Sequence, residues 1–451
     1  MLICCKKGHG KLILTKENAM ICKNLSRNDS GELCFANMPL TELGAKYGTP
    51  LYLYDEARIR EMCRTYLSAV KEAFGERGKA LYASKAASFR RLYEIMREEG
   101  MGIDVVSRGE ICTAKRAGYP LEKAYFHSNN KTDEDINYAM DNGVGYFVVD
   151  NSEELYAIDS FARERGIKQK ILLRITPGID PHTYAAVATG KVDSKFGSAI
   201  ETGQADEITG IALSLPGIEL MGFHCHVGSQ VFDSDVYIRA AEVMLEFVAH
   251  INEELGFLAK ELDIGGGYGV RYITEHPEID ISANIKEVGL FMKNKSAELG
   301  ITLPEIAFEP GRSIVADAGL TLYTVGTVKN IPGYKRYVSV DGGMTDNPRY
   351  ALYGAPYTIL HVTRENSAED EPVSVVGRCC ESGDVLQENV PLSPKTKRGD
   401  YIACLTTGAY NYSMASNYNR IPRPPVVMIS EGESYLAVRR ETVEDVSSLD
   451  V

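Results

Sequence analysis

Charged and polar residues that could do chemistry recur between residues 85 and 312, and each follows a short apolar segment. Ordinary loops in these places would be mostly Ser, Asp and Gly, whereas this set contains a lysine, a histidine, a glutamate and two arginines. Such residues can supply an amine nucleophile, a buried acid and an anion site. They are Lys85, Asp104, Asn129, Arg174, His226, residues 265–267 and residues 309–312.

Lys85 lies in the sequence YASKA, at the end of a strand-like segment. A lysine in that position is usually a solvated surface residue, and this feature alone favours that interpretation. Inside a barrel and beside a phosphate site, the same lysine could form a Schiff base with a cofactor that carries an aldehyde and a phosphate. Pyridoxal 5'-phosphate is the cofactor that fits this description.

Two glycine-containing loops, residues 263–269 and 309–313, are the candidate phosphate site. Glycines let backbone N–H groups approach an anion closely, although such a run can also be only a tight turn. No βαβ pair with a later ribose-binding acid frames the run, so it is not a dinucleotide fingerprint. Its position after the seventh and eighth strand-like segments favours phosphate, because barrels commonly bind phosphate there.

The other strand ends offer partners for the cofactor ring. An electron sink of this type needs a protonated pyridine nitrogen, which a carboxylate can hold. Glu309 is the first candidate for this role and Asp104 the second. His226 could stack on the ring while Ser229 reaches the phosphate. His224 and His226 alternate and therefore share a face, although a lone histidine at a strand end is more often a hydrogen-bonded core residue.

Eight short strand-like segments carry these residues, and amphipathic stretches with helical spacing lie between them. This alternation predicts a (β/α)8 barrel over residues 48–313, with its active site at the carboxyl ends of the strands. The strands are expected at residues 80–83, 103–106, 124–127, 146–149, 171–175, 220–226, 261–264 and 305–308. The helical stretches include residues 89–99, 109–117, 133–141, 152–165 and 236–255.

After residue 311 the chain changes to alternating runs separated by Gly and Pro, which is typical of antiparallel strands. These runs cover residues 321–329, 336–341, 357–362, 373–376, 401–405 and 435–439. Residues 11–14 and 20–22 are also strand-like and could pair with them. We therefore predict a C-terminal antiparallel β-domain completed by the N-terminal segment, made of residues 1–47 and 314–451.

Composition limits the possible partners. The 451 residues are 44% hydrophobic, which indicates a folded soluble protein, and they exceed the roughly 250 to 300 residues of one core. The net charge of -13, without clustered Lys and Arg, argues against nucleic acid and anionic membranes. We find no signal-peptide pattern and no apolar run of about 18 residues. The ten cysteines have no zinc-type spacing, so we expect no metal and a reduced, cytoplasmic protein.

Seven motifs in a fixed order give the chain a family resemblance. They are residues 82–86 (YASKA), 226–230 (HVGSQ), 263–267 (DIGGG), 309–312 (EPGR), 341–344 (DGGM), 380–384 (CESGD) and 408–410 (GAY). Over residues 48–425 the chain resembles the fold-type III pyridoxal-phosphate decarboxylases, most closely those that act on diaminopimelate. The resemblance implies decarboxylation of meso-2,6-diaminopimelate to L-lysine and CO2, the last step of lysine biosynthesis, by a homodimer.

The resemblance also implies a role for each matching residue. Lys85 would form the Schiff base, His226 would stack on the cofactor ring, and Glu309 would pair with its nitrogen. Cys380 would protonate the product, with residues 380–381 entering the active site of the partner subunit. Further cofactor contacts would come from Asp104, Arg174, Ser229, Gly266, Gly267, Gly311, Arg312 and Tyr410. The substrate would be bound by Arg312, Arg349, Tyr353, Glu381 and Tyr410.

The residue types agree with a substrate that has an amino acid at both ends. Arg312 and Arg349 can bind the distal carboxylate in a bidentate manner, and Glu381 can bind the distal ammonium. Without the resemblance, an ordinary polar turn followed by a strand is the favoured interpretation of Arg349 and Tyr353. A buried strand cysteine is likewise the favoured interpretation of Cys380, apart from the sequence ESGD that follows it at residues 381–384.

Other functions stay open on the sequence. One is a decarboxylase of the same fold that acts on ornithine, arginine or a D-amino acid, and Arg349 and Glu381 argue against it. Another is a catalytically silent regulatory homologue that binds another protein. The argument against that is the joint presence of Lys85, Glu309, Cys380 and Tyr410. An amino-acid racemase shares the barrel, but it would need a two-base arrangement that residues 380–381 do not suggest.

Overall fold

Eight parallel strands close into a barrel in the computed structural model, which describes residues 21–179 and 193–451. Each strand pairs with the next, and the β13–β5 and β8–β9 pairs complete the circle. The predicted (β/α)8 barrel is therefore confirmed. The strands are β5 (Gly78–Ala83), β6 (Gly102–Val105), β7 (Ala124–Phe126), β8 (Tyr146–Val149), β9 (Gln169–Thr176), β11 (Ile218–His224), β12 (Glu261–Asp263) and β13 (Glu305–Phe308).

Helices surround this sheet, and polar caps fix where several of them begin. Asn151 accepts a hydrogen bond from the Glu154 N–H at the start of α6, and Thr132 and Asp135 form a capping box at α5. No helix of the described ranges is long and apolar enough to cross a membrane. The helices are α2 (Glu56–Phe74), α3 (Arg90–Glu99), α4 (Arg108–Arg116), α5 (Asp133–Asp141), α6 (Ser152–Glu164), α7 (Gln204–Ser214), α8 (Ser234–Leu255), α9 (Ile281–Glu298) and α10 (Arg312–Val315).

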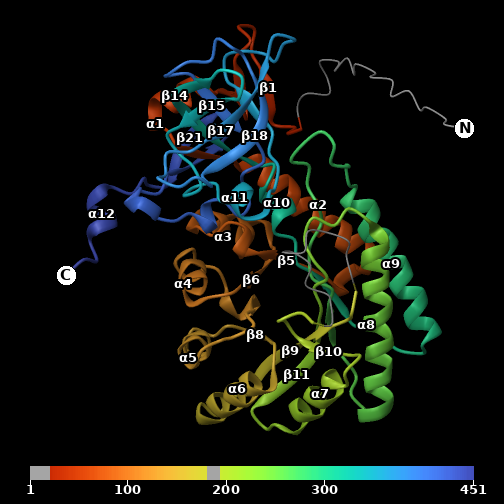
Figure 1. Ribbon diagram of the computed structural model, residues 1–451. Helices are drawn as coiled ribbons and strands as arrows, with labels where there is room; N and C mark the ends of the chain where they lie inside the picture. Colours follow the sequence, from red (N-terminus) through yellow and green to blue (C-terminus); the bar gives the residue numbers. More distant parts are fainter. Residues whose placement is uncertain (1–20, 180–192) are drawn as a thin grey trace, which may run out of the picture.

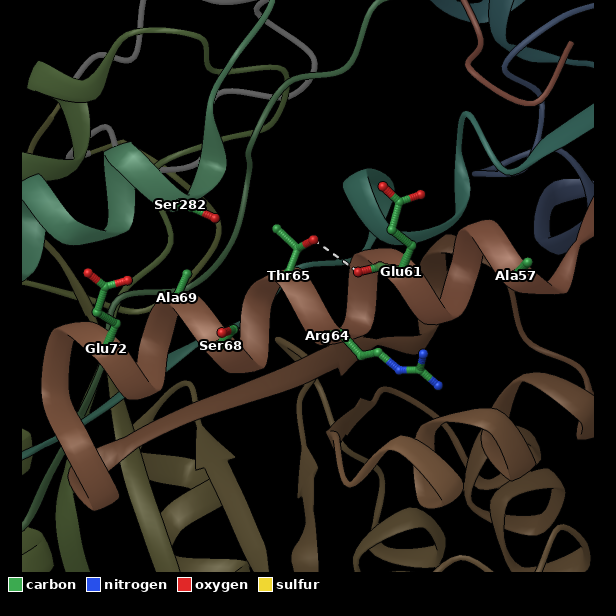
Figure 2. Close-up of a pocket in the computed structure, with 8 residues that line it drawn as sticks. All are labelled: Ala57, Glu61, Arg64, Thr65, Ser68, Ala69, Glu72 and Ser282. Carbon is green, nitrogen blue, oxygen red and sulfur yellow. Dashed lines mark hydrogen bonds between the residues drawn. The ribbon is translucent and has the colours of Figure 1, made fainter.

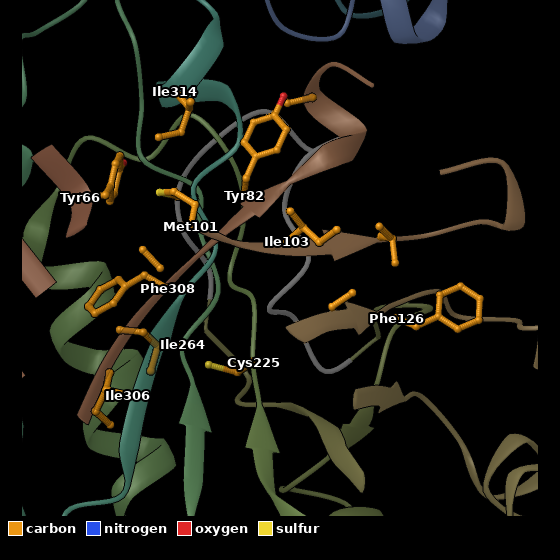
Figure 3. Packing of buried hydrophobic residues seen from close by; sticks show 14 of the residues in the cluster. Tyr66, Tyr82, Met101, Ile103, Phe126, Cys225, Ile264, Ile306, Phe308 and Ile314 are labelled. Carbon is orange, nitrogen blue, oxygen red and sulfur yellow. The ribbon is translucent and has the colours of Figure 1, made fainter. Parts of the chain in front are cut away.

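Strand residues alternate between two apolar clusters. The larger cluster packs the outer face of the barrel against the helices, and it includes Tyr82, Ile103, Phe126, Ile306 and Phe308 (Figure 3). The smaller cluster fills the inside of the barrel with Leu81, Tyr125, Val148, Leu172 and Ala307. Since side chains two positions apart share a face, the next inward positions are Ala83, His127, Asp150, Arg174 and Glu309. The alternation therefore directs these residues into the carboxyl end of the barrel.

A second sheet lies beside the barrel, with α10 between the two (Figure 1). Most of its strand pairs are antiparallel, but β15 and β17 are parallel, as are β4 and β20. The antiparallel prediction is wrong for these two pairs, because long connections let the chain return in the same direction. The strands are β4 (Leu51–Asp55), β14 (Gly319–Ile331), β15 (Lys335–Val340), β16 (Ile359–His361), β17 (Glu371–Val376), β18 (Val385–Leu392), β19 (Tyr401–Cys404), β20 (Val426–Ser430) and β21 (Glu433–Val438).

The N-terminal segment completes this second domain, as predicted. It forms a small sheet of β1 (Leu25–Arg27), β2 (Leu33–Phe35) and β3 (Met38–Pro39), followed by α1 (Leu40–Tyr47). Leu33, Phe35 and Leu40 share one buried cluster with Leu53 and Leu320. Of the strand-like segments predicted near the start of the chain, residues 11–14 and 20 lie outside the described residues. Residues 21 and 22 are not in a strand.

The start of the barrel differs from the prediction. The predicted range begins at residue 48 and so includes β4, yet β4 pairs with β14 on one side and β20 on the other. All five residues of β4 are buried, which suits a strand that is flanked on both sides. The end of the barrel at residue 313 stays a prediction.

A hollow on the outer surface runs along α2 toward the first turn of α9 (Figure 2). Its charged residues are held in ion pairs: Glu61 with Arg58 at 2.8 Å, Arg64 with Glu99 at 2.7 Å and Glu72 with Lys286 at 2.8 Å. None of the predicted site residues lines it. The lining residues are Ala57, Glu61, Arg64, Thr65, Ser68, Ala69, Glu72 and Ser282.

Leu53 offers a test of the contribution of β4 to the second domain. Leu53→Ala should lower the free energy of unfolding of that domain by about 2 to 5 kcal/mol, because the side chain is fully buried. Urea unfolding followed by circular dichroism measures this change. Leu436→Ala on β21 is the control, since Leu436 is 52% exposed and its loss should cost about 0.5 kcal/mol or less. Equal effects of both variants would contradict the assignment of β4.

Candidate active site

Ionisable side chains converge inside the carboxyl end of the barrel, as the alternation of its strands requires. They include Asp104, His127, Arg174, His224 and Glu309. Glu309 lies between the two histidines: its Oε1 is 2.7 Å from His127 Nε2, and its Oε2 is 3.1 Å from His224 Nε2. Asp104 is farther away, with Oδ1 4.0 Å from His127 Nε2. Apart from Arg174, which is half-buried, these side chains are at most 5% exposed.

The two histidines decide the charge of Glu309. Burial alone would raise the pKa of this carboxyl, but the contacts with His127 and His224 lower it well below its usual value. Burial lowers the pKa of His224 to about 4, although Glu309 opposes this change. His224 is therefore neutral near pH 7. Because a carboxylate only accepts hydrogen bonds, His224 must carry its proton on Nε2.

Lys85 lies at the mouth of the barrel, in a short turn that follows β5. Its Nζ is 3.8 Å from Asp104 Oδ2, and 43% of the side chain is exposed. Desolvation lowers the pKa of Lys85, but Asp104, Tyr410 and Glu309 outweigh this effect and raise it. The Tyr410 N–H donates to the Ala86 carbonyl at 2.7 Å, which holds the tyrosine beside the lysine. The amine is thus charged and open to a ligand.

Glycines and two polar side chains form the other end of the pocket. Arg312 donates to Ser229 Oγ from Nε at 3.2 Å and from Nη2 at 2.9 Å. A Cβ on Gly267 would lie 2.1 Å from the Gly228 carbonyl oxygen, so only glycine fits there. The pocket is lined by Ala83, Lys85, His226, Ser229, Gly267, Tyr268, Glu309, Gly311, Arg312, Ser313 and Tyr410.

This donor set fits pyridoxal 5'-phosphate. The pocket offers an amine for an aldehyde, an ionised carboxylate for a protonated ring nitrogen, and hydroxyl, guanidinium and glycine N–H groups for a phosphate. His226 provides a flat neutral ring, because burial lowers its pKa well below the usual value. Its Nδ1 accepts a hydrogen bond from the Gly266 N–H at 3.3 Å, which fixes the ring. Both Asp104 oxygens lack a hydrogen-bond partner among the described residues, as a site built for a ligand would allow.

Comparison with known proteins gives the family. The model of the "Pyridoxal-dependent decarboxylase, pyridoxal binding domain" matches residues 57–316. The diaminopimelate decarboxylase of Bacillus subtilis (strain 168) is 43% identical over 425 residues, which cover 94% of this chain and 96% of that protein. The chain belongs to the diaminopimelate decarboxylase family. It is a carboxy-lyase and its cofactor is pyridoxal phosphate.

Solved structures agree with this family. The diaminopimelate decarboxylase of M. jannaschii in complex with L-lysine superposes with a TM-score of 0.87 at 33% identity, over 95% of this chain and 98% of that chain. A lysine/ornithine decarboxylase of Vibrio vulnificus, complexed with putrescine, has a TM-score of 0.72 at 25% identity, over 87% and 98% of the two chains.

A second arginine of the decarboxylase lies close to the pocket. Arg349 begins the helix α11 (Arg349–Tyr353) and is 5% exposed, so the alternative of an ordinary polar turn followed by a strand is wrong. Its Nη1 donates to Tyr357 Oη at 2.6 Å, and its guanidinium lies 4.5 Å from the centre of the Tyr272 ring. Arg312 Nη1 donates to Tyr272 Oη at 2.7 Å. Tyr272 therefore connects two buried arginines, and neither has a carboxylate partner within residues 21–179 and 193–451.

Cys380 and Glu381 do not line this pocket. They lie in an exposed turn between β17 and β18, so the alternative of a buried strand cysteine is wrong. Buried Asp384 fixes the turn, because it accepts hydrogen bonds from the Met344 N–H at 2.6 Å and the Cys379 N–H at 2.7 Å. Tyr353 is also absent from the pocket lining, with 38% of its surface exposed. Within one chain, these residues are not part of the Lys85 pocket.

Three further residues of the site were missed by the sequence analysis. His127 was treated only as the last residue of a strand. Once the barrel was predicted, the two-residue alternation along that strand indicated that His127 points into the barrel. His224 had a signal in its alternation with His226, but no partner for it could be named. Tyr272 had no local signal, since its contacts come from α10 and α11, which are distant in sequence.

The hydroxyl of Tyr272 can be tested alone. Tyr272→Phe leaves a buried Arg312 N–H unpaired, at a cost of about 1 to 3 kcal/mol, and keeps the ring under Arg349. We expect the KM for the amino-acid substrate to rise roughly fivefold or more in steady-state assays. Tyr119→Phe is the control, because it removes a buried hydroxyl that bonds only the Met101 carbonyl. Unchanged kinetics in Tyr272→Phe would rule out this support of Arg312.

Proposed function

We propose that the Lys85 pocket decarboxylates meso-2,6-diaminopimelate to L-lysine and CO2, the last step of lysine biosynthesis. The observation that carries this proposal is the pair of buried arginines joined by Tyr272. A buried cation without a counter-ion is costly, so Arg312 and Arg349 favour an anionic ligand. The cofactor phosphate can occupy part of this site, and the distal carboxylate of the substrate fits the remainder.

Residues of both domains would hold the cofactor. Lys85 binds its aldehyde, Glu309 its ring nitrogen, and His226 the face of its ring. Once bound, pyridoxal phosphate supplies a protonated ring that accepts the electron pair left when CO2 departs. Asp104 and Arg174 complete the charged floor of the pocket. The phosphate is assigned to Ser229, Gly266, Gly267, Gly311, Arg312 and Tyr410.

The chain's own residues contribute binding and proton control. Glu309, kept ionised, holds the proton on the ring nitrogen throughout the reaction. Lys85 carries a proton on Nζ and is stabilised in that form by Asp104. The buried surroundings exclude water from this end of the pocket, which strengthens these charge interactions.

A second copy of the chain would supply the remaining groups. Cys380 and Glu381 are exposed, and the Asp384 hydrogen bonds hold their turn in a defined shape. We assign them to the partner's active site in a homodimer. There the Cys380 thiol gives a proton to the carbon that CO2 leaves, and the Glu381 carboxylate binds the distal ammonium. Tyr353 contributes to the same substrate site.

The cysteines suggest where this enzyme works. All eight cysteines within residues 21–179 and 193–451 are free thiols. Free thiols are the rule in reducing compartments. We therefore assign the enzyme to the cytoplasm.

Mixed dimers test the shared site. Lys85→Ala and Cys380→Ala chains should each be inactive alone, whereas their mixture forms hybrids with one intact site. After complete subunit exchange we expect roughly one quarter of wild-type activity. Native mass spectrometry confirms the exchange. If confirmed hybrids stay inactive, the shared site is wrong.

Substrate comparison tests the role of Arg349. L-Lysine and L-ornithine lack the distal carboxylate, so kcat/KM for meso-diaminopimelate should exceed theirs by roughly 30-fold or more, which corresponds to about 2 kcal/mol. Arg349→Met should reduce this preference. Arg439→Met is the control, because Arg439 is exposed and pairs with Asp445 away from the site. Turnover of ornithine at a rate equal to that of diaminopimelate would favour the alternative decarboxylase.

A further inference from the structure

Glu309 is the acid on which the proposed ring chemistry depends, and two histidines contact it from different strands. We propose that His127 and His224 are positioning residues that act through Glu309: together they keep its carboxylate ionised and fix its plane toward the cofactor ring. This inference rests on the role proposed above for Glu309.

The contacts occupy both oxygens of the carboxylate. His127 Nε2 lies 2.7 Å from Oε1, and His224 Nε2 lies 3.1 Å from Oε2. The His224 contact is a hydrogen bond, whereas the His127 contact is a close ion-pair contact, and Oε1 has no hydrogen-bond partner among the described residues. Since each oxygen can accept two hydrogen bonds, acceptor sites remain on both oxygens for a ring N–H. Restraint at both oxygens prevents rotation of the carboxylate, which a single partner would not do.

The histidines are themselves held rigidly. Their rings pack edge to face, with centroids 4.9 Å apart and an interplanar angle of 74°. His127 is 4% exposed and His224 is 1% exposed. They come from β11 and from the end of β7, on different sides of the barrel interior. The pair therefore holds Glu309 at a fixed place relative to the strands.

Comparison with the neighbouring acids indicates what the histidines do. Asp104 and Asp263 are also buried near Glu309, and burial raises the pKa of both carboxyls. The pKa of Glu309 moves in the opposite direction. For Asp104, proximity explains the difference, because His127 is 2.7 Å from Glu309 and 4.0 Å from Asp104. For Asp263, the negative charge of Glu309 adds to the effect of burial and raises the pKa further. The ionisable groups that face Glu309 are Lys85, Asp104, His127, Arg174, His224, Cys225, His226 and Asp263.

The same three side chains could also bind a divalent cation, since their ligand atoms lie within 4.8 Å of one another. A cation there would occupy the acceptor sites that the ring nitrogen needs. The two interpretations therefore predict opposite results when purified holoenzyme is analysed for metal. Less than about 0.1 equivalent of metal is expected, and one tightly bound equivalent that activity requires would overturn our proposal.

Paired substitutions of each histidine test whether an N–H group must reach the Glu309 carboxylate or whether any polar side chain is enough. Glutamine can place an amide N–H near the position of His Nε2, whereas the shorter asparagine cannot reach it. We expect His127→Asn and His224→Asn each to lower kcat about tenfold or more, with KM changed less, and to weaken cofactor binding to apoenzyme by a similar factor. His127→Gln and His224→Gln should stay within about threefold of wild type. His250→Asn is the control, since His250 is exposed on α8 and pairs with Asp206.

A double-mutant cycle with Glu309→Gln tests whether the histidines act through the carboxylate. If they do, adding His224→Asn to Glu309→Gln should cost little more than Glu309→Gln alone. Titration of apoenzyme with pyridoxal phosphate, followed by absorbance, provides a readout that does not depend on turnover. Thermal unfolding of each apoenzyme identifies any variant that fails to fold, and the Gln variants and the cycle then still decide the question.

The outcomes separate this inference from the function on which it rests. If Glu309→Gln binds the cofactor and turns over substrate as the wild type does, Glu309 does not act on the cofactor ring. The role of Glu309 in the proposed function would then be wrong. An impaired Glu309→Gln together with normal Asn variants would overturn the positioning role alone. Fully additive losses in the cycle would also overturn it, because the histidines would then act independently of Glu309.

Discussion

The closed parallel sheet is the constraint on which the active site depends. Its two-residue alternation and in-register pairing direct one side chain from each strand end to the same point inside the barrel. Acids and cations meet there in a volume that excludes most water, so each charge needs a partner. Glu309 contacts two histidines, whereas Asp104 has no hydrogen-bond partner among the described residues. The geometry of the sheet thus determines the electrostatics of the site.

The second domain contributes residues of the active site that do not lie on the barrel strands. Tyr410 is fixed beside Lys85 by a backbone hydrogen bond to Ala86, and Arg349 reaches Tyr272 from α11. In Figure 1, α10 and α11 both lie between the two domains. A substrate site built across this boundary requires the domains to keep a fixed relation. The strand β4 helps to fix it, because it joins the second sheet just before α2 of the barrel begins.

Much of the barrel was predictable from the sequence, because each strand is short, apolar and followed by a helix with its own periodicity. All eight strands lie within about two residues of their predicted positions. The second domain was harder: β1 to β4, β18 and β20 were missed, and two parallel pairs were not foreseen. Such pairs depend on partners distant in sequence, which local alternation does not specify. The same reason explains why Lys85 and Glu309 were found and Tyr272 was not.

A single chain leaves two sets of charged or reactive groups without partners, and the two sets are complementary. Its pocket region buries Arg312 and Arg349 without a carboxylate partner in the described residues, while the turn at Cys380 and Glu381 presents an acid and a thiol to solvent. Asp384 holds that turn through two backbone hydrogen bonds, although the turn contributes nothing to its own chain's pocket. Such order in an exposed turn is expected where a partner uses the shape. A second copy of the chain would place this turn beside the pocket of its partner and so supply both sets of groups with partners. For this reason we favour a symmetric dimer over a binding partner of another kind.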